Sequence, residues 1–245
     1  MIAVDNLTIR FGGLVALDGV SANFVAPVSG IIGPNGAGKT IIMNIVSGFL
    51  TSSSGNVNCD GTNLLVLNPY ARARWGLRRS FQKEQIADDL TVWENLLALA
   101  DNMQGSRAQK LHDVERAADY AGVTKIAAKR GADLNTLERR LTDVARCVIG
   151  NPKLVMFDEP AGGMTHEETQ RLGELIVGIP QFTGAQVLVI DHDVDLIERI
   201  CTETLVLDFG RRIAFGPTRT VLEDPAVQRA YLGVAPEEEA HAPSL

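Results

Sequence analysis

The sequence predicts an α/β fold in which a helical segment interrupts a sheet-containing core. Two continuous apolar runs, Leu154–Phe157 and Val187–Ile190, are typical of strands buried in a parallel sheet. A glycine-rich loop near the N-terminus separates a short apolar segment from a segment with helical spacing. Between these features, from about Thr91 to Cys147, the pattern is helical throughout. The 245 residues suffice for one large α/β domain or two small lobes.

The individual elements follow from apolar periodicity and from glycine and proline breaks. The expected strands are Ile2–Ile9, Val20–Val25, Ser29–Ile32, Leu154–Phe157, Val187–Ile190 and a late hairpin of Thr204–Leu207 with Arg212–Phe215. The segment Asn56–Leu67 is expected to be strand-like, with turns at Asp60-Gly61. The expected helices are Thr40–Phe49, His166–Gly178, Val194–Cys201 and a helical middle broken at Gly105, Gly122 and Gly131. Residues 235–245 are expected to form a disordered tail.

Composition narrows the function classes. The net charge of −7 argues against a general nucleic-acid binder. The three cysteines are widely spaced, which favours reduced thiols over a zinc site. The N-terminus lacks the pattern of a signal peptide, and no run of about 18 apolar residues is present. We therefore expect any membrane role to depend on a partner protein.

The glycine-rich loop fits the pattern GxxxxGK[ST] between a strand and a helix. Its glycines allow successive backbone N–H groups to point at phosphate oxygens, and the following helix adds its positive end. Lys39 is expected at the β- and γ-phosphates, and the Thr40 hydroxyl is expected to bind Mg²⁺. The predicted nucleotide-binding residues are Gly33, Pro34, Asn35, Gly36, Ala37, Gly38, Lys39, Thr40 and Ile41.

Two acidic residues follow the first apolar run. Asp158 at the end of a buried strand beside a phosphate loop is expected to hold Mg²⁺, and Glu159 to activate the attacking water. The alternative interpretation of this acidic pair is a polar strand end that caps a helix. It is less favoured here, because the phosphate loop requires a partner acid.

Three further residues are candidates. His192 follows the second apolar run and is expected to sense the γ-phosphate, although a single histidine is more often structural. Gln82 is expected to ligate Mg²⁺ through its amide oxygen. Phe11 is expected either to stack on adenine or to pack in the core.

These motifs, in this order over about Ile2 to Val234, resemble the ATP-binding cassette ATPases. The resemblance implies a P-loop NTPase fold, with a RecA-like core, an antiparallel β subdomain and a helical subdomain inserted at about residues 83–150. It implies ATP and Mg²⁺ as ligands, and a head-to-tail dimer with two ATPs in its interface. It also implies that Phe11 is the adenine-stacking aromatic, Gln82 the Q-loop glutamine and His192 the switch histidine.

Three further segments are similar to importers of the branched-chain amino acid type, namely residues 10–17, 206–216 and 224–233. A fourth segment, residues 163–169, is similar to the urea-transporting members of that group. The resemblance implies a peripheral subunit at the cytoplasmic face of the membrane. Its partners would be a second, non-identical ATPase subunit, integral membrane permeases and, indirectly, an extracytoplasmic solute-binding protein. A coupling helix of the permease is expected to dock beside Gln82, at about Lys83–Asn95.

The sequence departs from the family at the signature loop, where LSGGQ is replaced by residues Leu134–Glu138. Leu137 places a branched side chain where glycine allows close approach, and Glu138 places a carboxylate near phosphates. These changes predict a heterodimer with one efficient ATP site, in which this chain supplies Lys39, Asp158, Glu159 and His192.

Two alternatives to the importer stay open: an ATPase of lipid or polysaccharide export, and a soluble cassette ATPase that acts on DNA or ribosomes. The arginine cluster Arg72, Arg74, Arg78 and Arg79 is expected to be a solvated face rather than a partner contact.

Overall fold

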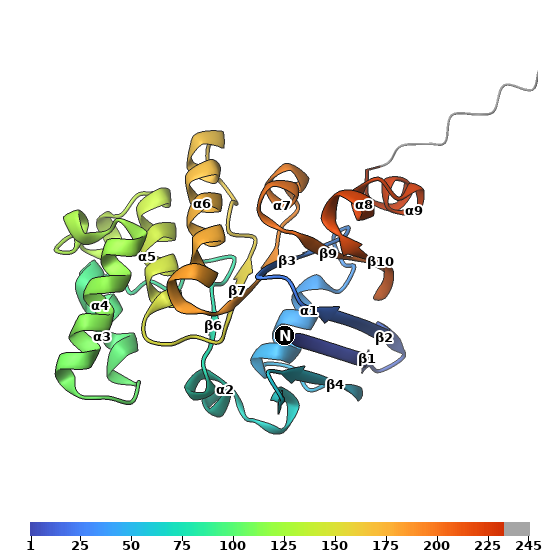
Figure 1. Ribbon diagram of the computed structural model, residues 1–245, viewed down its shortest axis with the longest axis horizontal. Helices are drawn as coiled ribbons and strands as arrows, with labels where there is room; N and C mark the ends of the chain where they lie inside the picture. The colour runs from blue at the N-terminus through green and yellow to red at the C-terminus, as the bar shows by residue number, and fades with distance from the viewer. Residues whose placement is uncertain (233–245) are drawn as a thin grey trace, which may run out of the picture.

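The computed structural model describes residues 1–232, and its first strands form a four-stranded antiparallel sheet with the order β2-β1-β4-β5 (Figure 1). The strands are β1 (Ile2–Phe11), β2 (Leu14–Phe24), β4 (Ser54–Cys59) and β5 (Thr62–Asn63). The first two are longer than the predicted Ile2–Ile9 and Val20–Val25. They extend to the Gly12 turn, whose φ of +59° only glycine adopts readily.

The second sheet has six strands in the order β10-β9-β3-β8-β7-β6. These are β3 (Val28–Ile32), β6 (Leu77–Arg79), β7 (Leu154–Asp158), β8 (Gln186–Ile190), β9 (Glu203–Asp208) and β10 (Arg211–Pro217). Neighbouring strands are parallel except for the β9–β10 hairpin. The two predicted apolar runs thus form adjacent central strands, and their carboxyl ends lie at one edge beside that of β3.

The helices flank these sheets, and α3, α4 and α5 gather at one side of the molecule (Figure 1). The helices are α1 (Lys39–Ser47), α2 (Pro69–Trp75), α3 (Val92–Asp101), α4 (Arg107–Ala121), α5 (Thr136–Val148), α6 (His166–Thr183), α7 (Val194–Ile200), α8 (Thr218–Leu222) and α9 (Pro225–Val227). Short 3-10 turns cover Leu64–Val66, Thr124–Ile126 and Gly131–Asp133, and a π-helical turn covers Gln228–Leu232.

The segment from Asn56 to Asn68 follows the prediction only as far as β5. The turn predicted at Asp60-Gly61 lies between β4 and β5, but the strand-like character does not continue to Leu67. After β5, the Asn63 side chain accepts a hydrogen bond from the backbone of Leu65 and starts a 3-10 turn. The Asn68 side chain then caps α2, with proline at the first helical position. Side-chain capping therefore overrides the apolar pattern here, and the sequence analysis missed α2 and β6.

Helix α6 continues beyond its predicted end at Gly178. Pro180 lies inside the helix, which ends at Gly184 in the left-handed conformation with φ of +78°. The predicted end at Gly178 was therefore wrong. The helix continues through Pro180 and ends at Gly184.

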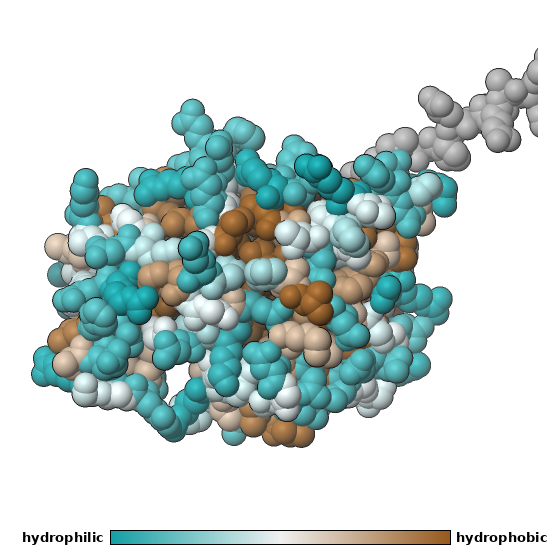
Figure 2. All heavy atoms as spheres, viewed as in Figure 1, coloured by the Kyte–Doolittle hydropathy of each residue, from teal (hydrophilic) through white to brown (hydrophobic). Residues whose placement is uncertain are grey.

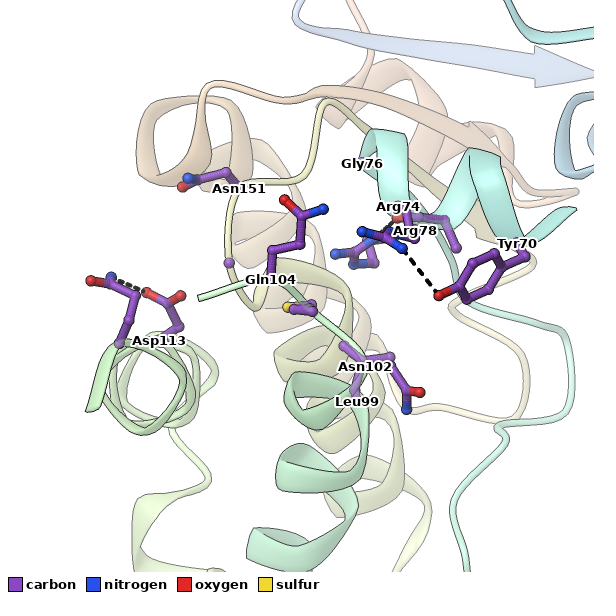
Figure 3. A pocket seen from close by; sticks show the side chains of 13 residues that line it. Tyr70, Arg74, Gly76, Arg78, Leu99, Asn102, Gln104, Asp113 and Asn151 are labelled. Atoms are coloured by element: carbon purple, nitrogen blue, oxygen red, sulfur yellow. Dashed lines mark hydrogen bonds between the residues drawn. The ribbon is translucent and has the colours of Figure 1, made fainter. Parts of the chain in front are cut away.

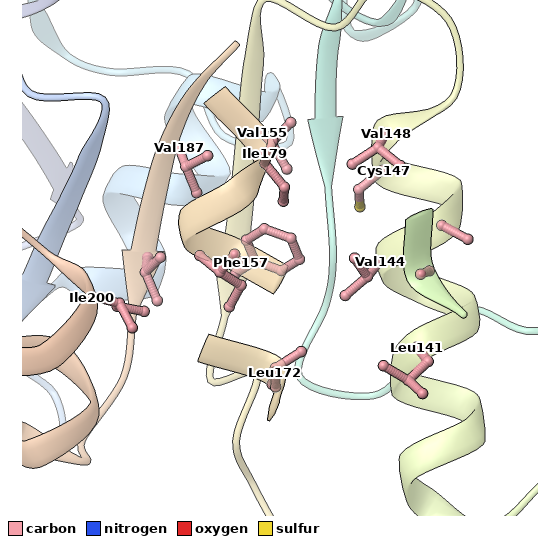
Figure 4. Packing of buried hydrophobic residues seen from close by; sticks show 14 of the residues in the cluster. Leu141, Val144, Cys147, Val148, Val155, Phe157, Leu172, Ile179, Val187 and Ile200 are labelled. Atoms are coloured by element: carbon pink, nitrogen blue, oxygen red, sulfur yellow. The ribbon is translucent and has the colours of Figure 1, made fainter. Parts of the chain in front are cut away.

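Two buried clusters hold these layers together. One packs β7 and β8 against α5 and α6, with Val144, Phe157 and Leu172 among its members (Figure 4). The other lies between the two sheets and around α1, with Phe24 and Met43 completely buried. Because the phosphate loop connects β3 to α1, both ends of the loop are fixed by packing.

The face of the molecule that Figure 2 shows is mainly hydrophilic, with separate hydrophobic patches. Within residues 1–232, no helix has both the length and the apolar composition needed to cross a membrane. The predicted tail at residues 235–245 lies outside the described residues.

Candidate functional site

The phosphate loop runs from Gly33 to Gly38, between β3 and α1. Gly38 caps α1 with φ of +104° and provides no side-chain acceptor, so the first backbone N–H groups of the helix remain available for a ligand. A Cβ atom on Gly33 would lie 2.1 Å from the carbonyl oxygen of Leu207. The backbone N–H of Gly210 donates to the Ala37 carbonyl at 3.1 Å, so the β9–β10 hairpin supports the loop from behind.

Lys39 is the first residue of α1 and is 6% exposed. Its Nζ donates to the carbonyl oxygens of Gly33 at 2.6 Å and Pro34 at 2.9 Å. Burial lowers the pKa of Lys39, and the nearby carboxylates of Glu159, Asp158 and Asp191 oppose that effect. The ammonium group therefore lies between the phosphate loop and a group of acids, where a phosphate ligand would meet it. Thr40 is exposed at the next position.

The acidic residues occupy the carboxyl end of β7, beside the end of β8. Asp158 is 4% exposed. Glu159 follows the strand with φ of +50°, and its backbone N–H donates to the Ile190 carbonyl at 2.7 Å. A left-handed backbone in a residue other than glycine is strained, and such strain is concentrated at functional sites.

Gln82 contacts Glu159 directly: its Nε2 donates to Glu159 Oε2 at 2.7 Å. Two residues that were proposed separately from the sequence, 77 positions apart, therefore meet through their side chains. The segment that carries Gln82 is held from the helical side as well. Arg140 of α5 forms an ion pair with Glu84 at 3.0 Å, and Arg146 donates to the Gln85 carbonyl at 2.6 Å.

The arginine cluster is not a solvated face, and this expectation was wrong for two of its members. Arg72 is 4% exposed and donates to the carbonyl oxygens of Ile45, Val46 and Leu67, which include those at the end of α1. Arg79 forms a buried ion pair with Asp158, Nη2 to Oδ2 at 2.7 Å. Arg74 is exposed, as we expected for the whole cluster. Composition cannot separate these cases, because all four arginines stand within eight residues of each other.

Asp191 is a further candidate for the site that the sequence analysis did not select. Its side chain is completely buried, and Oδ1 accepts from the backbone N–H groups of His192 at 2.8 Å and Asp193 at 3.0 Å. Oδ2 accepts from Ala161 at 3.3 Å, which ties the end of β8 to the turn after Glu159. The His192 side chain is 63% exposed, with Nδ1 3.5 Å from Asp191 Oδ1. The sequence feature that could have identified Asp191 is its position directly after the apolar run Val187–Ile190.

Phe11 lies at the turn between β1 and β2 and is 47% exposed. Of the two alternatives left open for this residue, core packing is therefore wrong. The following strand reaches the phosphate loop, because a Cβ atom on Gly38 would lie 2.6 Å from the Leu17 side chain. An exposed aromatic ring at the rim of this strand offers a surface for a planar base.

The segment Leu134–Glu138 begins α5, with Asn135 as the N-cap. Asn135 Oδ1 accepts from the Glu138 N–H at 2.8 Å, and Glu138 Oε2 accepts from the Asn135 N–H at 2.9 Å. Lys129 Nζ contacts the same carboxylate oxygen at 2.5 Å. The repulsive charge that we expected at Glu138 is thus compensated, whereas Leu137 packs against the core cluster.

The chemistry of these residues fits a nucleotide with a divalent cation. The loop glycines and the start of α1 supply backbone donors, and Lys39 supplies a positive charge for phosphates. The Thr40 hydroxyl, the Asp158 carboxylate and the Gln82 amide are hard oxygen ligands of the kind that Mg²⁺ prefers.

A cavity lies apart from these residues. It has a volume of about 450 Å³ and opens between α2, α3 and α4, where Tyr70, Arg74, Leu99 and Asp113 face it (Figure 3). A smaller cavity of about 220 Å³ adjoins it and is lined by Phe49, Phe81 and Arg79 among others. The second cavity therefore reaches the chain next to Gln82.

Comparison with known proteins identifies the family. Residues 24–162 match the family model for the ABC transporter. The chain is 32% identical over 252 aligned residues to the high-affinity branched-chain amino acid transport ATP-binding protein LivG of Salmonella typhimurium, covering 96% of this chain and 98% of that protein. BraF of Pseudomonas aeruginosa, with the same description, is 33% identical over 96% of this chain and 98% of its own.

An export protein and solved structures show the same relationship. The lipopolysaccharide export system ATP-binding protein LptB of Escherichia coli is 29% identical, covering 95% of this chain and 97% of its own. The crystal structure of the ADP conformation of MJ1267, an ATP-binding cassette of an ABC transporter, superimposes with a TM-score of 0.83 at 27% identity, over 96% of this chain and 99% of that one. The chain belongs to the ABC transporter family, as one of its ATP-binding subunits with ATPase activity.

Proposed function

We propose that this chain is the ATP-hydrolysing subunit of an ABC importer that takes up a small polar solute, such as a branched-chain amino acid, urea or a similar amide. The similarity to LivG and BraF over 96% of the chain supports transport of such a solute, because both relatives are described as high-affinity branched-chain amino acid transport ATP-binding proteins. The 2.7 Å contact between Gln82 and Glu159 carries the hydrolytic part of the proposal, since it joins two segments of the site directly.

In this proposal the phosphate loop binds the triphosphate through its backbone N–H groups, and Lys39 neutralises charge at the β- and γ-phosphates. Phe11 stacks on the adenine ring. Mg²⁺, when bound, neutralises charge that develops on the phosphate oxygens. Glu159 orients the attacking water and accepts its proton, and His192 donates a hydrogen bond to the γ-phosphate.

Gln82 links the chemistry to movement. Its amide nitrogen donates to Glu159, and its amide oxygen would be a ligand of Mg²⁺ when the metal is bound. Arg140 and Arg146 fix the segment after Gln82 to α5, so a shift of Gln82 is transmitted to the helical part of the chain.

The partners would be integral membrane permeases, with an extracytoplasmic solute-binding protein on the other side of the membrane. We expected the permease to dock at about Lys83–Asn95. The smaller cavity supports docking of the permease close to this segment, because the cavity is lined by Phe81, which precedes Gln82, and by Leu99 of α3. A peripheral position at the cytoplasmic face of the membrane follows from this arrangement.

The second ATPase subunit is proposed to be non-identical. Two observations at the start of α5 support this. The Asn135 side-chain oxygen is occupied by the Glu138 N–H, and Leu137 adds a branched side chain at the loop where glycine is expected. The site formed by this loop with the partner's phosphate loop would hydrolyse ATP poorly, and the site formed by Lys39, Asp158 and Glu159 would carry most of the turnover.

ATPase activity of the complex tests this proposal. The chain is co-purified with its partner ATPase and permease subunits in proteoliposomes, and hydrolysis is compared between wild type and Glu159→Gln. Glutamine preserves the size of Glu159 and its contact with Gln82 but cannot accept the water proton. We expect turnover to fall at least about 100-fold with ATP affinity retained.

Uptake of labelled leucine or urea, driven by ATP on the side of this subunit, separates the candidates. Import with either solute supports the proposal. ATP hydrolysis without import, together with extraction of a lipid or lipopolysaccharide from the membrane, would favour the export function suggested by the 29% identity to LptB. Unchanged hydrolysis in Glu159→Gln would remove Glu159 from the mechanism.

A further inference from the structure

The Asp158 carboxylate is bound by an arginine of the neighbouring strand. Arg79 is the last residue of β6 and reaches Asp158 at the end of β7, with Nη2 2.7 Å from Oδ2. Both side chains are buried, with 5% and 6% of their surfaces exposed. Their backbones are fixed relative to each other, because Ser80 N–H donates to the Met156 carbonyl at 2.8 Å.

The Arg79 guanidinium is held on its other side as well. Nη1 donates to Asn44 Oδ1 at 2.8 Å and to Ser47 Oγ at 3.0 Å, both on α1. The group also lies over the ring of Phe81, 4.7 Å from its centroid, which is within range of a cation–π contact. Arg79 therefore joins α1, the strand before Gln82 and Asp158 at one point.

We propose that Arg79 is a positioning residue, which orients the Asp158 carboxylate for Mg²⁺. This inference rests on the proposed role of Asp158 in holding the metal. Arg79 occupies Oδ2 and so fixes the rotation of the carboxylate, which directs Oδ1 away from the guanidinium. A charge-assisted hydrogen bond of this kind restricts geometry more strongly than a neutral one.

Charge supports the same role. Asp158, Glu159 and Asp191 all act electrostatically on Lys39, so three acids gather around one ammonium group. A buried carboxylate is costly unless an opposite charge and hydrogen bonds accompany it. Arg79 supplies both to Asp158, with Nη2 2.7 Å from Oδ2. Partners that orient a metal-binding carboxylate typically contribute about 10- to 100-fold to metal affinity.

Metal-dependent nucleotide binding tests this role without requiring hydrolysis. Binding of a fluorescent non-hydrolysable ATP analogue to the purified chain is measured in EDTA and over a range of free Mg²⁺. The Mg²⁺ concentration at half-effect is the free Mg²⁺ concentration that gives half of the Mg²⁺-dependent change in analogue binding. For Arg79→Met, we expect this concentration to rise about 10- to 100-fold, while binding of the analogue in EDTA changes little. Arg79→Lys retains a charge near Asp158 and is expected to restore part of the Mg²⁺ response.

Arg72→Met is the matched control. Arg72 is equally buried but donates only to backbone carbonyls, so its loss should lower thermal stability and leave the Mg²⁺ concentration at half-effect unchanged. If Arg79→Met does not fold, the double variant Asn44→Ala with Ser47→Ala removes both partners of Nη1. That variant is expected to raise the Mg²⁺ concentration at half-effect by about two- to tenfold.

The outcomes are distinct. A Mg²⁺ response in Arg79→Met, or in the double variant, that matches wild type would overturn the positioning role. If nucleotide binding by the wild-type chain did not depend on Mg²⁺, the proposed metal site itself would fail, whatever the behaviour of Arg79.

Discussion

At the scale of single residues, the site depends on backbone conformations that few side chains adopt. Gly33 has φ of +150°, and a Cβ atom there would lie 2.1 Å from a backbone oxygen of β9. Glu159 has φ of +50° although it is not glycine. The first position excludes any side chain by contact, and the second keeps a strained backbone next to the water that it is proposed to activate.

The residue-scale prediction is that Gly33→Ala lowers the free energy of unfolding by at least about 2 kcal/mol, because the loop must move away from Leu207. The matched control is Gly13→Ala, where a Cβ atom meets nothing within 4 Å. Chemical denaturation of both variants measures the difference. Equal stability of Gly33→Ala and the control would show that the loop relaxes without cost.

At the scale of elements, the start of α5 is stabilised by a capping box together with an ion pair. Glu138 accepts from the Asn135 N–H and contacts Lys129, so both interactions require the ionised carboxylate or benefit from it. The hydrogen bond from Lys129 and that from Asn135 hold the pKa of Glu138 below its usual value. The capping box and the ion pair thus act on the same carboxylate at the start of α5.

The element-scale prediction concerns pH. Because the folded-state pKa of Glu138 is lowered, its contribution to stability is fully present above the unfolded pKa of about 4.3 and is lost as pH falls below that value. Glu138→Gln should therefore be less stable than wild type at pH 7, by up to about 1 kcal/mol, and this difference should shrink below about pH 4. Urea unfolding at several pH values measures it, and a pH-independent difference would contradict the ion-pair account.

At the scale of the whole molecule, the proposed dimer is asymmetric because this chain retains its nucleotide-binding residues and lacks the glycine at position 137. The prediction is that the isolated chain hydrolyses ATP slowly and that Leu137→Gly raises this turnover several-fold. Removal of the branched side chain allows the closer backbone approach that a partner nucleotide requires.

Ala108→Gly provides the control for this experiment. Ala108 is exposed and is the second residue of α4, as Leu137 is of α5, so both variants carry a similar cost of about 1 kcal/mol in helix propensity. Its turnover should stay at the wild-type level. Turnover in the isolated wild-type chain that equals that of the full complex would reject the one-site hypothesis.

Much of the candidate site follows from sequence because its residues stand in short local patterns. The phosphate loop, Asp158 and Glu159 are each fixed by an adjacent strand and turn, and local spacing reports these directly. Arg79 was missed because its role depends on Asp158, 79 positions away in the chain. Asp191 stands in the same local pattern as Asp158, an acid at the end of an apolar strand, but only the structure shows its contact with Ala161, 30 positions away.

The amino-acid sequence alone is sufficient for the α/β class, the phosphate loop and the acids at strand ends, because these follow from periodicity and from residues that are adjacent in the chain. The three-dimensional structure was needed to distinguish buried from exposed arginines, to place Gln82 on Glu159 and to find Lys129 beside Glu138. These facts depend on the order of strands in the sheet and on side-chain contacts between residues that are not neighbours in the sequence, which local spacing does not encode.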